Sequence, residues 1–135
     1  MSKIFLALVF PILLFGFKWD YTHEFTLKKD QVAKIKVTKR SDKSVQWIEF
    51  RWTLYTNDRL ILLTKYDSFP NQYTLQHKYK RNSIKIDLRD DYGDGFKRAY
   101  MILTFKDFGS SKATLITDIT DPKKSIEIEF VDPKK

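Results

Sequence analysis

The sequence predicts an all-β protein, an antiparallel β-sandwich, from three observations. Most of the chain alternates apolar and polar residues with a period of two, as strands with one buried and one solvated face do. Turn-forming residues recur at the short intervals that all-β folds need. No stretch of the sequence combines a capping residue with apolar residues three and four apart, so we expect no substantial helix.

Two arrangements of the predicted strands are compatible with this pattern. An immunoglobulin-like Greek key is favoured, because a long strand, central apolar strands and a closing hairpin follow one another in an order that suits it. A small closed β-barrel is the alternative, because periodicity alone cannot distinguish two packed sheets from one closed sheet.

Individual strands follow from the same pattern. Four segments have apolar residues at every second position: 19–28, 33–38, 84–89 and 126–130. Residues 60–63 and 100–105 are apolar at nearly every position, which predicts central strands covered on both faces. Turn-forming residues separate the strands at 40–43, 56–58, 69–71, 81–82, 91–95, 109–111 and 121–124. These boundaries predict about nine strands.

The segment 45–55 predicts one long strand with a single apolar face. Its predicted core-facing side chains are Ile48, Phe50, Trp52 and Leu54. Trp47 and Tyr55 fall on the opposite face, which we expect to be partly exposed.

The N-terminus has the pattern of a secretory signal peptide. Lys3 is followed by an uncharged run of fourteen residues, Ile4 to Phe17, and the apolar region of a signal peptide spans about 7–15 residues. A membrane-spanning helix would need about 20, so an uncleaved anchor is the less favoured interpretation. With cleavage after Gly16, we predict a signal peptide over residues 1–16 and a single all-β domain over residues 17–135.

The composition of the remaining chain favours a bacterial periplasmic or secreted protein. The chain has no cysteine and no Asn-x-Ser/Thr glycosylation site, whereas disulfides and glycosylation are common in eukaryotic secreted proteins. A core without disulfides must come from apolar burial, and the sequence supplies 11 Phe, 7 Tyr and 3 Trp for it.

The charge of the chain favours an anionic partner. Lysines and arginines number 25 and acidic residues 17, a net charge of +8, which becomes +7 if Lys3 is removed with the signal peptide. We expect an acidic protein or an anionic component of the cell envelope, and no nucleic acid in that compartment. The alternative is that these cations keep the protein soluble and discourage sheet edges from pairing.

Aromatic and basic side chains interleave between residues 65 and 81. Flat rings can stack on a ligand while cations hold its anionic groups, so this segment is the best candidate recognition surface. With one tryptophan from the long strand, the predicted ligand-binding residues are Trp47, Tyr66, Tyr73, Lys78, Tyr79, Lys80 and Arg81. The alternation of Tyr73, Leu75 and Tyr79 is equally typical of a core-facing strand.

Other motifs give no site that we can predict. His23 and His77 could meet if their strands paired, but two ligands are too few for zinc, so we expect no metal. Residues 90–95 resemble the start of a calcium loop through Asp90 and Asp94, but the later ligand positions do not fit, and a tight connection is favoured.

We therefore expect a small, exported, non-enzymatic binding protein without a cofactor. No nucleophile, phosphate-binding loop or metalloprotease motif is present, and no catalytic residue is predicted. The alternative is a carrier of a small apolar ligand. Its predicted binding residues are Trp47, Trp52, Tyr66, Tyr73 and Tyr79.

Overall fold

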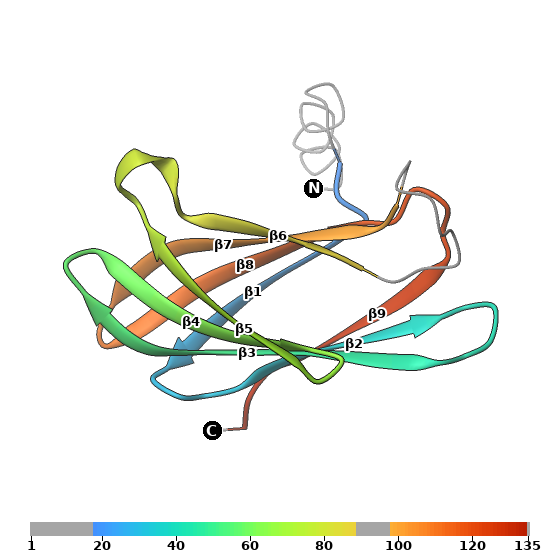
Figure 1. The fold of residues 1–135 in the computed structure, drawn as a ribbon, viewed down its shortest axis with the longest axis horizontal. Coiled ribbons are helices and arrows are strands. Elements are labelled where there is room, and N and C mark those ends of the chain that lie inside the picture. The colour runs from blue at the N-terminus through green and yellow to red at the C-terminus, as the bar shows by residue number, and fades with distance from the viewer. Residues whose placement is uncertain (1–17, 89–97, 135) are drawn as a thin grey trace, which may run out of the picture.

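Two antiparallel sheets pack against each other (Figure 1). A computed structural model describes residues 18–88 and 98–134; the predicted signal peptide over residues 1–16 and the loop at residues 90–95 lie outside them. The four-stranded sheet has the order β1 (Tyr21–Lys28), β8 (Lys112–Thr120), β7 (Tyr100–Gly109) and β6 (Ser83–Asp87). The five-stranded sheet has the order β5 (Phe69–Gln76), β4 (Arg59–Tyr66), β3 (Val45–Thr56), β2 (Ala33–Lys39) and β9 (Ile126–Val131).

The predicted β-sandwich is confirmed, with nine strands in the described part of the chain. The only helix there is a three-residue 3-10 turn, η1 (Lys78–Lys80), which joins β5 to β6. Two separate sheets, each with two edge strands, agree with a sandwich rather than a closed barrel. The immunoglobulin-like Greek key is not confirmed, since β2 to β5 and β6 to β8 pair mostly with their neighbours in sequence. No helix among the described residues is long and apolar enough to cross a membrane.

The core lies between the sheets and is rich in aromatic rings. Phe25 of β1, Phe50 of β3 and Phe105 of β7 are fully buried. Phe25 meets Phe50 edge to face at 5.3 Å between ring centroids, which joins the two sheets directly. These positions agree with the predicted alternation of buried and exposed residues along each strand.

A β-bulge in β3 changes which side chains of the long strand reach the core. The register with β4 shifts between Trp52 and Leu54, and the extra residue reverses the alternation beyond it. The prediction was therefore wrong at two positions. Leu54 is 52% exposed on the outer face, and Tyr55 turns inward to stack on Phe108 at 3.9 Å.

Two further predictions are corrected. The central strands β4 and β7 are inside their sheets as predicted, but only one face of each is buried, and Ile61, Leu63 and Ile102 remain half-exposed on the other. The turn predicted at residues 69–71 is wrong, because β4 and β5 are joined at Asp67 and Ser68, both with positive φ. The chain therefore re-enters a strand at Phe69 and passes through Pro70 in an extended conformation.

Candidate functional site

The structure divides the predicted recognition residues between two ends of the sandwich. Lys78 and Lys80 lie in η1 and Arg81 follows it, and all three side chains are exposed. Trp47 lies on the outer face of β3, where it is 41% exposed. Tyr66 is half-buried at the far end of β4 and donates a hydrogen bond to Gln46 Oε1 at 3.1 Å.

The register of the β4–β5 hairpin sets the separation between these groups. Tyr66 pairs with Phe69 beside the turn, whereas Gln76 pairs with Arg59 at the other end of β5. A strand of this length spans roughly 20–25 Å. Trp47 and Tyr66 therefore do not share a site with the cations that follow Gln76.

Two remaining predicted residues lie along β5 and η1. Tyr73 is half-buried on the inner face of β5, which fits the core-facing interpretation of that alternation. Tyr79 lies within η1, and its side chain falls outside what the structure describes. The predicted set thus reduces to three exposed cations at one end and one exposed tryptophan elsewhere.

Four further cations lie at the same end of the sandwich as η1. Lys28 pairs with Lys112 where β1 and β8 meet at this end, and Lys29 follows in the β1–β2 turn. Arg59 pairs with Gln76, the last residue of β5, and the N–H of Gln76 donates to the carbonyl of Arg81 at 2.9 Å. We call this surface the basic end, defined by Lys28, Lys29, Arg59, Lys78, Lys80, Arg81 and Lys112, all exposed.

Core packing brings these turns together. Tyr55, beside the β3–β4 turn, stacks on Phe108, beside the β7–β8 turn. The ring of His77, directly before η1, lies 4.6 Å from that of Phe105 in β7. Figure 1 shows η1 and these two turns at the same end of the molecule. Cations that are distant in sequence therefore lie on one surface of the molecule.

Carboxylates at this end do not neutralise the seven cations. None of the seven makes an ion pair within residues 18–88 and 98–134. Asp30 pairs instead with Arg51 at 3.1 Å, and Asp107 accepts the N–H of Phe108 at 2.8 Å. Asp58 accepts the hydroxyl of Tyr55 at 3.2 Å.

The tyrosine in this last pair remains a hydrogen-bond donor. Burial, and then the bond to Asp58, raise the pKa of Tyr55, so its hydroxyl stays protonated at neutral pH. Asp58 and Asp107 keep their negative charge in bonds to these neutral donors, so the seven cations outnumber rather than lack carboxylates at this end.

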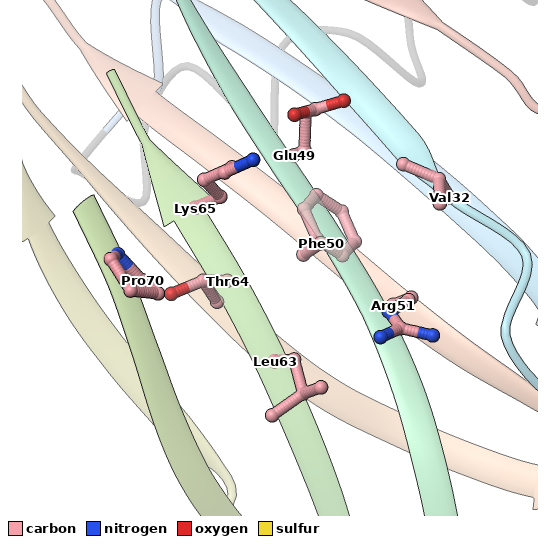
Figure 2. A pocket seen from close by; sticks show the side chains of 8 residues that line it. All are labelled: Val32, Glu49, Phe50, Arg51, Leu63, Thr64, Lys65 and Pro70. Carbon is pink, nitrogen blue, oxygen red and sulfur yellow. The ribbon is translucent and has the colours of Figure 1, made fainter. Parts of the chain in front are cut away.

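The outer face of the five-stranded sheet has a small hollow of about 260 Å³ (Figure 2). Leu63 and Lys65 of β4, Pro70 of β5 and Arg51 of β3 surround it. Trp47 lines a neighbouring hollow of about 290 Å³ that also includes Glu49. Because Glu49 faces Lys34 at 3.7 Å, charge on this face is partly compensated.

The two histidines lie apart, contrary to the possibility that their rings meet. His23 of β1 stacks on Phe130 at 4.8 Å and lies 3.0 Å from Asp132. His77 packs on Phe105 at the other side of the fold, next to η1. Within the described residues no three His, Cys, Asp or Glu side chains form a group that could hold a metal ion.

The ligand-binding residues predicted from the sequence include three members of the basic end and leave out the other four. Lys78, Lys80 and Arg81 are consecutive enough to stand out in the sequence, whereas Arg59 and Lys112 are isolated cations beside predicted turns. Only strand pairing places them with the others. Comparison with protein-family models, curated proteins and solved structures found no match to this chain.

Proposed function

We propose that the protein is an exported, non-enzymatic binding protein whose basic end holds an anionic partner in the bacterial periplasm or cell envelope. The observation that carries the proposal is the group of seven exposed cations at one end, without ion pairs among the described residues. The N-terminal apolar run and the absence of cysteine support the compartment.

An excess of positive charge at one end favours long-range association with an anionic partner. Oppositely charged partners are steered toward such a surface, and salt screens this attraction with a Debye length of about 8 Å at physiological ionic strength. The partner is an acidic protein or an anionic component of the envelope, since either can bring several negative charges to the basic end at once.

The carrier hypothesis has less support. Trp52 is 4% exposed, its indole N–H donates to the carbonyl of Leu27 at 2.8 Å, and its ring packs edge to face on Phe108. This aromatic side chain already has core partners. Two surface hollows of about 350 and 500 Å³ are within the roughly 300–1,000 Å³ of typical ligand pockets. Charged side chains such as Lys34, Lys28 and Asp132 line them, and none of the predicted aromatic residues does.

Chromatography on immobilised heparin, a sulfated polyanion, tests the proposal. Replacement of Lys78, Lys80 and Arg81 by Ser removes three of the seven exposed cations, so the variant should elute at a clearly lower salt concentration than the wild type. The matched control replaces Lys36, Lys43 and Lys65 by Ser, which removes the same charge away from the basic end.

The control should elute close to the wild type. If both triple variants elute together, retention follows net charge and the basic end is not a binding surface. If the Lys78, Lys80 and Arg81 variant elutes with the wild type at low salt, the proposed function is wrong. Circular dichroism of each variant verifies that the β-sheet content is unchanged.

A further inference from the structure

The edge strand β5 differs from the other edge strands in carrying no charged side chain. Edge strands expose unpaired N–H and C=O groups, and natural proteins protect them with charges, above all lysine. Charged residues stand on the other three described edges: Glu24 and Lys28 on β1, Lys85 and Asp87 on β6, Glu127 and Glu129 on β9. β5 reads Phe-Pro-Asn-Gln-Tyr-Thr-Leu-Gln, protected only by Pro70 near its start.

The free hydrogen-bonding groups of β5 can be assigned from one bond. The N–H of Gln76 points away from β4, because it donates to the carbonyl of Arg81. Backbone groups of an antiparallel strand alternate between its two sides. The N–H groups of Thr74 and Gln72 therefore point away from β4 as well. Pro70 is the next residue on this side, and it has no N–H to offer.

Contacts between the edge strands β1 and β9 close the opposite side of the sandwich, whereas we find no hydrogen bond or ring contact between β5 and β6 in residues 18–88 and 98–134. There the His23 ring of β1 stacks on Phe130 of β9, and the Tyr21 hydroxyl donates to the carbonyl of Ile126 at 3.3 Å. On the β5 side, Ile84 and Ile86 of the edge strand β6 are only half-buried, and Phe69 is 65% exposed. An added strand would cover part of this apolar surface.

We propose that β5 is a docking edge for an extended acidic segment of a partner protein, which adds a sixth strand to the five-stranded sheet. Main-chain bonds to Gln72 and Thr74 would hold the segment, in the manner of β-strand addition. The open edge ends where Arg81 pairs with the outer side of Gln76, and Lys78 and Lys80 lie in the turn between these two residues. Carboxylates of the segment that follow its pairing with Thr74 would therefore meet these cations. This inference rests on the proposed function and names the partner as a protein.

Charge selects this occupant over a second copy of the chain. Each copy carries a net charge of +8, or +7 without Lys3, so two copies repel each other, whereas an acidic strand is attracted. The added strand should be apolar at alternate positions, because its inner face would cover the half-buried Tyr73 and Ile84.

A proline at residue 74 should block strand addition at β5 without unfolding the protein. Thr74→Pro removes an N–H that points away from β4. Pro70, four residues earlier, already lacks an N–H on the same side of β5, so the hairpin should remain intact. Thr74→Val keeps the N–H and is the matched control. Gln72→Pro is a second blocking variant with the same geometry, and thermal unfolding reports whether each variant is folded.

The probe is a fluorescent peptide of about twelve residues that alternates Val and Thr and ends in glutamates; a second peptide ends in lysines instead. Measured by fluorescence anisotropy, the acidic peptide should bind the wild type and Thr74→Val within twofold of each other. Thr74→Pro should weaken binding at least tenfold. Hydrogen exchange should slow at Gln72 and Thr74 when the acidic peptide binds, and the lysine-ended peptide should bind at least tenfold more weakly.

The outcomes separate the two proposals. Binding that survives Thr74→Pro and Gln72→Pro but is lost when Lys78, Lys80 and Arg81 become Ser overturns the docking edge and leaves the basic end. Binding that is lost on Thr74→Pro but not in that triple variant overturns the anionic-partner proposal. No binding of the acidic peptide to the wild type overturns the edge. A wild-type dimer that Thr74→Pro converts to monomer makes a second copy the occupant and overturns the acidic segment.

Discussion

Asp121 is a buried carboxylate that organises the crossing from β8 to β9. It is 1% exposed, and its two oxygens accept the N–H of Ser125 at 3.1 Å, the hydroxyl of Ser125 at 3.3 Å and the N–H of Ile126 at 3.1 Å. Buried N–H groups need partners. The carboxylate therefore supplies acceptors that the backbone of the turn does not.

Replacement of Asp121 by Ala should destabilise the protein by about 2–4 kcal/mol, because it leaves two backbone N–H groups without their acceptor in a buried turn. The free energy of unfolding in urea measures this. Asp118→Ala, in the preceding strand β8, is the matched control, since the one hydrogen bond that Asp118 accepts among the described residues is the exposed one from Thr22 at 2.9 Å. If Asp121→Ala lowers the free energy of unfolding no more than the control does, water replaces the carboxylate as the acceptor of these hydrogen bonds.

At the level of elements, the two-residue hairpin turns share one unusual property. Positive φ occurs at both central residues of three turns: Asn57–Asp58, Asp67–Ser68 and Ser110–Ser111. This is the backbone of a type I′ turn, which matches the twist of the strands and is usually built with glycine. Because a left-handed conformation strains residues with a Cβ atom, these turns fix the strand registers at a cost in stability.

Glycine at residue 111 should relieve that strain. Ser111 has φ of 62°, so Ser111→Gly should raise the free energy of unfolding by up to about 1 kcal/mol, with no change in register. Ser111→Ala is the control, because it also removes the hydroxyl but keeps the strained Cβ atom. The urea midpoints of the two variants should differ. Equal midpoints would mean that the turn conformation is not strained.

The strands were largely predictable from the sequence, and the bulge was not. Alternation identifies a half-buried strand because each residue reports its own face. A bulge at Trp52 and Leu54 has no comparable local signal, since the extra residue depends on pairing with β4. For the same reason the sequence indicated Lys78, Lys80 and Arg81 as a group but not Arg59, which joins them only through pairing with Gln76.

For the molecule as a whole, the two ends of the sandwich differ in how their charges are used. The seven cations of the basic end lack ion pairs within the described residues. At the other end, turn carboxylates bond to the backbone: Asp42 accepts the N–H of Ser44 at 2.9 Å, and Asp20 accepts that of Asp121 at 2.6 Å. The two turns are joined by the bond from Arg40 N–H to the carbonyl of Ser125.

These carboxylates make the fold sensitive to acid. Hydrogen bonds from Ser44 lower the pKa of Asp42. Burial alone would raise the pKa of Asp20, but its bonds to Lys124 and to the N–H of Asp121 together lower it. A folded-state pKa below the unfolded value of about 3.9 stabilises the fold above that pH, and this stabilisation is lost as the pH falls through the folded-state pKa.

The free energy of unfolding should therefore be nearly constant from pH 7 to about pH 5 and fall below about pH 4. Asp20→Asn removes one of these contributions, so it should be less stable than the wild type at pH 7, and the difference should narrow toward pH 2. Glu129→Gln is the control, because the exposed Glu129 makes no hydrogen bond or ion pair that we find in the described chain, and its difference from the wild type should stay small throughout. Urea unfolding across this pH range, followed by circular dichroism, measures both variants. If Asp20→Asn is less stable than the wild type by the same free energy at every pH, the negative charge of Asp20 is not what stabilises the fold.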